Sequence, residues 1–419
     1  MREAFLRGLH KDPNVFNHSP IKMLPTYLSV VPNGTEVGKF ISIDLGGSNF
    51  RFFAINIIDG NLSSKALHYP VLEIAMTGDR DDLFDFMAKC IKESLIKLEI
   101  NVKIIEFLGF TFSFPVKQLA LNSGIATYFT KGFCTKNVVG HDVVALMTSA
   151  CKKLELKILD YVLINDTTGT LLCGAFENPD TIIGIINGTG TNACYIENID
   201  KVKKYESANS VKQLLINTEW GSFGEDGGLN SILTKFDINN DSQSINSGKQ
   251  ILEKLCSGMY LGEIARLIFI SFENTLILFV QEIPEELKIK NSFPTSYISK
   301  SYDKNEFIKC FKETYHYDLN DIEYHNIAYV CDIVSYRSAC LSAIGLAAII
   351  QKMGVKRGTI AGDGSMFKLH PRFLKYVEQV LTCLVDGQFT ILLVEDGSGK
   401  GAALAACVAS SNKHNSTLH

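Results

Sequence analysis

Hydrophobic residues along the chain gather into short continuous runs separated by polar, glycine-rich turns. The runs 40–58 and 181–197 each contain two apolar segments around such a turn, DLGGSN in the first and NGTGTN in the second. Short apolar runs bounded by turn residues are typical of buried strands, so each run predicts a pair of strands. Further strands are predicted within 104–114, 158–164, 359–370 and 391–410.

Segments with apolar residues at every third or fourth position predict helices between these strands. They are 82–98, 142–154, 249–266 and 328–352, and the first fourteen residues can form a short helix docked on the surface. Alternating strands and helices indicate an α/β protein. Because two glycine-rich hairpins each open an α/β unit, we expect a duplicated domain with a nucleotide held between the halves.

The composition is that of a globular protein with more than one domain. The chain has 419 residues, 46% hydrophobic and 21% charged, and a formal charge of −4. This length predicts two domains. The slightly acidic balance argues against nucleic acid as a partner, although a neutral total can hide a local basic patch. No apolar run reaches the roughly 20 residues of a membrane span, so we expect no integral membrane segment.

The eleven cysteines are scattered without C-x-x-C pairs. An odd, scattered set suits reduced, mostly buried thiols better than disulfides or a zinc site. We therefore expect a cytoplasmic protein without a structural metal. The N-terminus also lacks the apolar stretch of a signal peptide.

Two stretches carry the candidate chemistry. Residues 108–133, LGFTFSFPVKQLALNSGIATYFTKGF, form an apolar strand that breaks into a polar loop, and INDTTGT at 164–170 follows another strand. A carboxylate at the tip of a buried strand, such as Asp166, can take a proton from a polyol. The glycine hairpins expose backbone N–H groups that attract phosphate, and Asp44 could hold hydrated Mg²⁺; the alternative is that these are ordinary structural turns.

The runs LGFTFSFP, TKGF and INDTTGT resemble the sugar-binding signature of the eukaryotic hexokinase family, and family-like blocks extend from Phe5 to Val408. The resemblance implies a two-lobed actin-like or ribonuclease-H-like ATPase fold with a duplicated β-sheet core and an active-site cleft between a small and a large domain. The small domain would comprise 26–163, with the C-terminal helix, about 400–412, packed back on it. The large domain would comprise 1–25 and 164–399.

The resemblance implies an activity as well. It is the ATP-dependent phosphorylation of a hexose at its 6-hydroxyl, giving hexose 6-phosphate and ADP in the first step of glycolysis, with Mg²⁺ required. Glucose is the first candidate, followed by fructose and mannose. The protein would be a monomer or a homodimer. The N-terminus is short for the family, so we expect that an upstream regulatory or membrane-anchoring segment is either missing here or never existed. From the length of the chain, a second fused catalytic half is not expected.

Individual roles follow from the same resemblance. Asp166 and Lys131 would be the catalytic residues: Asp166 would act as the base, and Lys131 would serve both ligands. The sugar-contacting positions are Ser113, Thr130, Lys131, Asn165, Asp166, Asn192, Glu219 and Glu253. The nucleotide-contacting positions are Asp44, Gly46, Gly47, Ser48, Asn49 and Arg51 in the first turn, Gly188, Thr189 and Gly190 in the second, and Gly364 and Ser365 in the third, with Asp44 acting on Mg²⁺ through water.

Three positions depart from the family pattern. Phe129 replaces a tryptophan, Asn187 an apolar residue and Lys400 an arginine. None of them removes a residue assigned to chemistry, but Asn187 adjoins the second phosphate turn and could alter nucleotide affinity. Two alternatives remain open at this point: a non-catalytic sugar sensor or regulator on the same fold, and an actin-like or chaperone-like ATPase, which would need no hexose loop.

Overall fold

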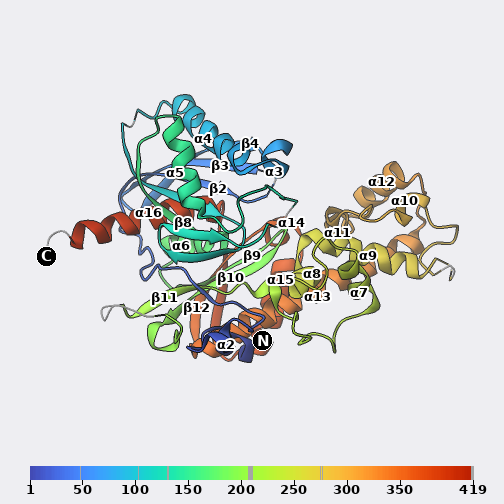
Figure 1. The fold of residues 1–419 in the computed structure, drawn as a ribbon. Coiled ribbons are helices and arrows are strands. Elements are labelled where there is room, and N and C mark those ends of the chain that lie inside the picture. Colours follow the sequence, from blue (N-terminus) through green and yellow to red (C-terminus); the bar gives the residue numbers. More distant parts are fainter. Residues whose placement is uncertain are drawn as a thin grey trace.

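The computed structural model describes residues 1–47, 49–101, 103–129, 132–205, 211–273, 275 and 277–416. The fold is built on two β-sheets, and each sheet contains one of the two glycine-rich hairpins predicted from the sequence (Figure 1). We call the part built on the five-stranded sheet the small lobe and the part built on the six-stranded sheet the large lobe. The predicted α/β architecture with a duplicated sheet core is confirmed.

The small lobe begins with an antiparallel meander and continues with parallel strands. Its central strand β2 pairs antiparallel with β3 and parallel with β5. β2 is buried over its last five residues, which explains its continuous apolar run. The strands in their order across the sheet are β4 (Asn61–Pro70), β3 (Asn49–Ile58), β2 (Gly38–Leu45), β5 (Ile105–Phe112) and β8 (Ile158–Ile164).

Helices cover the small sheet, and the lobe also contains a separate two-stranded sheet. The predicted helices at 82–98 and 142–154 are present as α4 and α5, which pack on one another. Their N-termini are capped by Asp79 and Asp142. The elements are α3 (Glu73–Thr77), α4 (Arg80–Lys97), β6 (Val116–Ala120), β7 (Ser123–Ala126) and α5 (Val143–Lys153).

The six-stranded sheet repeats this plan. β9 and β10 form the second glycine hairpin, and β12 runs parallel to β9 on its other side. The strands in their order across the sheet are β1 (Leu24–Pro25), β11 (Gln213–Asn217), β10 (Thr191–Asn198), β9 (Thr181–Asn187), β12 (Arg357–Asp363) and β13 (Gln388–Leu393).

The remaining helices of the large lobe surround this sheet and extend away from it (Figure 1). The N-terminal helix α1 is docked through buried Ala4 and Phe5, as predicted. The helices are α1 (Arg2–Gly8), α2 (Pro13–Phe16), α6 (Asp166–Glu177), η1 (Ile199–Lys201), η2 (Trp220–Ser222), α7 (Lys235–Ser242), α8 (Ile251–Cys256), α9 (Gly258–Ser271), α10 (Glu285–Lys288), α11 (Thr295–Lys300), α12 (Lys304–Tyr315), α13 (Asp321–Met353), α14 (Ser365–Leu369) and α15 (Phe373–Leu384).

One helix prediction is wrong. The segment 249–266 was expected to form a single helix, but it is divided into α8 and α9 at Ser257, whose extended backbone (φ −90°, ψ 151°) interrupts the helix. Gly258 then donates its N–H to the carbonyl of Gly188 at 2.7 Å instead of to a helical carbonyl. The break is therefore made by a tertiary contact with the second glycine turn, which the local periodicity does not show.

The long helix α13 begins seven residues before the predicted start. Within the part of the chain that the structure describes, it is the one helix long and apolar enough to cross a membrane, and 61% of its most apolar window is buried. Its N-terminus is fixed by a capping box between Asn320 and Glu323, and Gly354 ends it in the left-handed conformation. Such burial is typical of a core helix.

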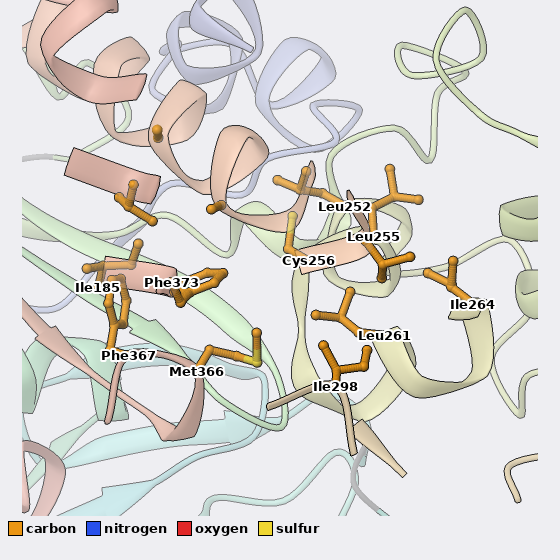
Figure 2. Close-up of a cluster of buried hydrophobic side chains, with 14 of the residues drawn as sticks. Ile185, Leu252, Leu255, Cys256, Leu261, Ile264, Ile298, Met366, Phe367 and Phe373 are labelled. Carbon is orange, nitrogen blue, oxygen red and sulfur yellow. The ribbon is translucent and has the colours of Figure 1, made fainter. Parts of the chain in front are cut away.

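The C-terminal helix α16 (Gly397–Ser416) contacts both lobes. It packs on β2, β3, β5 and β8 of the small sheet and on α6 of the large lobe. Figure 2 shows a second apolar cluster, where side chains from β9, α8, α9, α11, α14 and α15 meet. The predicted domain boundaries at 25/26 and 163/164 remain predictions; backbone bonds of Thr26 and Leu28 to Leu215 continue past the first of them along β11.

The eleven cysteines are all free thiols, and seven of them are buried. Burial raises the pKa of several of them, to about 12 for Cys173 and Cys194, so these thiols stay protonated at neutral pH. They behave as small apolar side chains of the core.

Candidate active site

A cleft of about 1330 Å³ separates the two lobes and collects most of the predicted site. Both sheets contribute to its wall. The predicted residues that line it are Gly46, Gly47, Asn49, Arg51, Ser113, Asn165, Asp166, Gly188, Thr189, Gly190, Asn192, Glu219, Glu253, Gly364 and Ser365. Asp44 lies behind this wall. Ser48, Thr130 and Lys131 lie outside the described residues.

Asp166 lies where β8 of the small sheet passes into α6. Asn165 is the N-cap of α6, and its Oδ1 accepts hydrogen bonds from the N–H of Thr167 at 2.8 Å and from its hydroxyl at 2.6 Å. The Oδ1 of Asp166 also accepts from Thr167 N–H, at 2.8 Å. A carboxylate in the first turn of a helix is stabilised by the N-terminal end of the dipole. Asp166 is thus held in one orientation at the wall of the cleft.

A chain of amide and carboxylate groups lies beside it. Asn192 donates from Nδ2 to Oδ1 of Asn217 at 2.7 Å, and Asn217 donates to Oε1 of Glu219 at 2.8 Å. The side-chain Oδ1 of Asn192 accepts from the Thr218 hydroxyl at 3.1 Å. Each side chain therefore has a fixed orientation. Groups that both donate and accept in fixed positions are suited to bind a polyol.

Glu253 connects this polar group to the second glycine turn. Its Oε2 accepts a hydrogen bond from Thr191 N–H at 3.1 Å. A Cβ at Gly190 would lie 2.5 Å from the same oxygen, so a larger residue there would displace the Glu253 carboxylate. The Glu253 carboxylate on α8 is therefore in direct contact with the turn of the β9–β10 hairpin.

Sequence reasoning missed Gln250. This side chain lines the cleft, is 5% exposed, and donates from Nε2 to the hydroxyl of Tyr128 at 2.8 Å. The contact joins the loop after β7 of the small lobe to the large lobe. Gln250 has a left-handed backbone (φ 54°), held by its N–H bond to Glu225 at 2.9 Å. Its position three residues before Glu253 is the only sequence signal.

The first glycine turn is supported by an ion pair between a buried carboxylate and a partly exposed guanidinium. Asp44 on β2 is fully buried and is the cross-strand partner of Arg51 on β3. Its Oδ2 accepts from Arg51 and, at 2.6 Å, from the hydroxyl of Ser398 in α16. Asp44 is the main reason that the pKa of the Arg51 guanidinium is raised. The Arg51 guanidinium therefore stays positively charged and lines the cleft next to the first turn.

Ser398 is a second residue that sequence reasoning missed. It lines the cleft, accepts a hydrogen bond from Arg51 at 2.8 Å, and anchors the start of α16 to the first turn. The glycine-rich run around it was a visible signal, but its partner Asp44 is 354 positions away in the chain.

The second and third turns lie side by side because β9 and β12 are parallel neighbours. In the second turn, Gly188 N–H donates to the carbonyl of Gly190 at 2.9 Å. In the third, Gly364 adopts φ +108°, and a Cβ there would lie 2.4 Å from the carbonyl oxygen of Asn187. The preceding Asp363 accepts from Gly364 N–H and from Lys368, both at 2.6 Å.

Taken together, the cleft has two chemical halves. One half presents fixed carboxylates and amides around Asp166, and the other presents glycine turns whose small side chains leave the backbone open to a ligand. Such turns are suited to phosphate groups. No group of three or more His, Cys, Asp or Glu side chains that could hold a metal ion occurs among the described residues. The arrangement can place a hydroxyl beside a base and a phosphate chain next to both.

Comparison with known proteins matches nearly the whole chain to one protein family. Residues 1–176 and 182–408 match two family profiles, both described as hexokinase. Hexokinase-1 of Mus musculus is 40% identical over 422 residues, which cover 97% of this chain and 43% of that protein. Hexokinase-2 of Homo sapiens is 38% identical over 423 residues, covering 98% and 46%. The chain thus spans less than half the length of these curated relatives.

Two solved structures have the same fold. A hexokinase from Schistosoma mansoni complexed with glucose superimposes with a TM-score of 0.90 at 36% identity, over 97% of this chain and 93% of that one. A further hexokinase crystal structure gives a TM-score of 0.82 at 28% identity, over 97% and 94%. With matching profiles over both lobes and a two-lobed structure to fit them, the chain belongs to the hexokinase family.

Proposed function

We propose that the protein transfers the γ-phosphoryl group of ATP to the 6-hydroxyl of a hexose, with glucose as the first candidate and fructose and mannose as further ones. The observation that carries the proposal is the shared cleft, in which Asp166 and the polar group of Asn192, Glu219 and Glu253 lie next to three glycine turns. The S. mansoni relative, whose structure holds glucose, supports the choice of sugar.

Asp166 would accept the proton of the 6-hydroxyl as its oxygen attacks phosphorus. Phosphoryl transfer depends mainly on positioning and charge compensation, so a base held in one orientation contributes much of what the protein can supply. The carboxylate is fixed by Thr167 N–H, and the hexose would be fixed by Asn165, Asn192, Glu219 and Glu253, with Ser113 closing the small-lobe side. Thr130 and Lys131 keep the roles that the resemblance implies.

The nucleotide would lie along the three turns. Gly46, Gly47 and Asn49 face it from the small lobe, with the Arg51 cation beside them, and Gly188, Thr189 and Gly190 face it from the large lobe. Gly364 and Ser365 would receive the adenosine end. Each glycine lets the backbone approach the phosphate oxygens without a side chain between them.

Mg²⁺ fits this site through Asp44. The carboxylate is fully buried and one oxygen is engaged by Arg51 and Ser398, but its Oδ1 has no hydrogen-bond partner and lies under Gly46. That arrangement suits contact with a hydrated ion better than direct ligation, as Mg²⁺ keeps several waters. When bound, the ion neutralises negative charge on the phosphates.

The test is a coupled assay with MgATP and a panel of glucose, fructose, mannose, galactose and N-acetylglucosamine. We expect rapid ADP formation with at least one hexose and none with MgATP omitted. A protein that is stabilised against heat by glucose but shows no turnover with any sugar would overturn the catalytic proposal and support a sugar sensor. The pattern across the panel identifies the preferred hexose in the same experiment.

A further inference from the structure

The stems of the second glycine turn are both tied to one helix. Asn187 on β9 and Thr191 on β10 are cross-strand partners on either side of the turn Gly188–Gly190. Asn187 donates from Nδ2 to the hydroxyl oxygen of Ser342 in α13 at 2.8 Å. Thr191 accepts from the indole N–H of Trp220 at 3.2 Å. A side-chain hydrogen bond therefore fixes the strand residue at each end of the turn.

Trp220 connects Thr191 to α13, because its indole ring packs on that helix. A Cβ at Gly345 would lie 2.7 Å from its indole ring, so the ring rests directly on the helix at that glycine. Ser342 and Gly345 are three positions apart and therefore lie on one face of α13. Both stems of the turn are consequently positioned by the same helical face.

Ser342 belongs to a longer polar chain. Its hydroxyl donates to the carbonyl of Ser338 at 3.0 Å, and the Ser338 hydroxyl donates to the carbonyl of Cys256 at 2.6 Å. Cys256 is the last residue of α8, the helix that carries Glu253. Cys256 itself belongs to the apolar cluster that also contains Ile185 and Met366 (Figure 2). The Ser342 hydroxyl that accepts from Asn187 is therefore itself held by a further hydrogen bond within α13.

Asn187 is an unfavourable residue for stability at this position. Its side chain is fully buried, and its carbonyl oxygen Oδ1 has no hydrogen-bond partner. An apolar side chain of similar size would avoid burying an unpaired oxygen. It would leave no other group unsatisfied, because Ser342 still donates to Ser338. A residue that breaks a local rule in this way is expected where function requires it.

The backbone of Asn187 also supports the third turn. Gly364 packs against its carbonyl, and the adjoining carbonyl of Gly188 accepts the N–H of Gly258 at 2.7 Å. Movement of Asn187 would therefore displace the second turn, the third turn and the start of α9 together. All three border the half of the cleft assigned to the nucleotide.

We propose that Asn187 is a positioning residue for the nucleotide: its hydrogen bond to Ser342 fixes the Gly188–Gly190 turn in the orientation that receives the phosphates. This inference rests on the proposed function, since it concerns the nucleotide half of that same cleft. It assigns Asn187 no contact with ATP and no role in hexose binding.

The decisive variant is Asn187→Val. We expect the KM for MgATP and the Kd for MgADP, measured by calorimetry without hexose, to rise about tenfold, which corresponds to about 1.4 kcal/mol. The KM for the hexose should stay within about twofold, and the Tm should equal or exceed that of the wild type. A merely structural role would instead lower the Tm and impair both substrates together.

Two further variants serve as controls. Ser342→Ala removes the acceptor and should also weaken MgADP binding, while Asn187→Val/Ser342→Ala should be no weaker than Asn187→Val alone, because both changes break one interaction. Asn240→Leu changes another buried asparagine, on α7, whose Nδ2 has no partner. It should alter the Tm and leave MgADP binding unchanged.

Failure of this inference is separable from failure of the proposed function. An active wild type with unchanged MgATP KM and MgADP Kd in Asn187→Val would overturn the inference alone. A wild type that phosphorylates no hexose would overturn the proposed function, and the MgADP titrations would still decide whether Asn187 positions the turn.

Discussion

At the scale of single residues, Asp166 is the side chain on which the proposed reaction depends most. The loop between β8 and α6 holds it by a backbone hydrogen bond that does not require a negative charge. Asparagine retains the accepting oxygen and the shape of the side chain but cannot take a proton. The proposed base can therefore be removed while the surrounding geometry is kept.

We accordingly predict that Asp166→Asn lowers kcat by about a thousandfold, within the range of 10²–10⁴ typical of a lost general base. Hexose affinity should change only a few-fold, because the neighbouring amide and carboxylate groups remain. Trp220 is the only tryptophan and is 1% exposed next to the cleft residue Thr191, so its fluorescence can report hexose binding directly.

The matched control is Asp180→Asn, which makes the same chemical change at an exposed turn between α6 and β9. Its kcat should equal that of the wild type. Near-normal turnover of Asp166→Asn, with hexose binding intact, would remove Asp166 from the role of base.

How far single residues could be predicted from sequence depends on how local their partners are. Asn165, Asp166 and Thr167 form their contacts within one short motif, so the motif was sufficient. Asn187 and Ser342 are 155 positions apart, and nothing in either local sequence indicates the hydrogen bond between them. The departure at Asn187 was visible from the family pattern, but its partner required the fold.

At the scale of elements, the contact between α6 and α16 joins the two lobes. A Cβ at Gly401 would lie 2.0 Å from the carbonyl oxygen of Gly169, and one at Gly109 would lie 2.2 Å from the carbonyl of Ala402. The two helices and β5 therefore approach at backbone distance. The alanine- and glycine-rich sequence of α16 is explained by this close packing.

Gly401→Ala should lower the free energy of unfolding by about 1–3 kcal/mol, the usual cost of adding a methyl group to a filled core. A Tm several degrees lower in calorimetry, with a hexose KM close to the wild-type value, would fit this expectation. Ser411→Ala, on the exposed part of the same helix, should change stability by no more than about 0.5 kcal/mol. Equal Tm values for the two variants would contradict the close-packing argument.

Element boundaries were predictable where hydrophobic periodicity decides them and not where a tertiary contact does. The strand pairs around the two glycine turns follow directly from their apolar runs. The division between α8 and α9 at Ser257 does not, because the amide of Gly258 is engaged by the second turn. The hydrophobic periodicity continues across Ser257, although the helix is interrupted there.

At the scale of the whole molecule, one buried histidine is expected to limit stability in acid. His370 is 4% exposed between α14 and α15, where Nδ1 accepts from Arg372 N–H at 3.2 Å and Nε2 faces the Ser335 hydroxyl of α13 at 3.0 Å. Burial lowers its pKa to about 4; nearby Asp332 opposes this shift and Arg372 adds to it. The neutral ring is therefore part of the folded state.

Because the folded pKa lies below the unfolded value of about 6.5, the unfolded chain binds more protons as the pH falls. Stability from this group is complete above pH 6.5 and should decrease by about 3 kcal/mol by pH 4. Calorimetry of the wild type and of His370→Gln between these pH values measures the effect. The decrease should be smaller by this amount in the variant, and parallel curves would show that His370 does not contribute.

The cleft itself leads to the last expectation, which concerns water. The wall comes from both lobes, and the contacts between them include the chain crossing from β8 to α6, the helix α16 and the hydrogen bond of Tyr128 with Gln250. Closure of the two lobes on a bound ligand would exclude water from the reacting phosphate. Hexose should then be required to bring the first and second turns to the nucleotide together.

Without sugar, ATP hydrolysis should accordingly be at least about a hundredfold slower than hexose phosphorylation, a difference of about 2.7 kcal/mol in activation free energy. A pyranose that lacks the 6-hydroxymethyl group separates closure from acceptor chemistry. It can occupy the polar side chains around Asp166 and close the lobes, but it leaves water as the only acceptor, so hydrolysis should increase when it is added. Hydrolysis that is as fast without any sugar as phosphorylation is with hexose would mean that the two turns already meet in the open cleft, and that the sugar supplies only a hydroxyl.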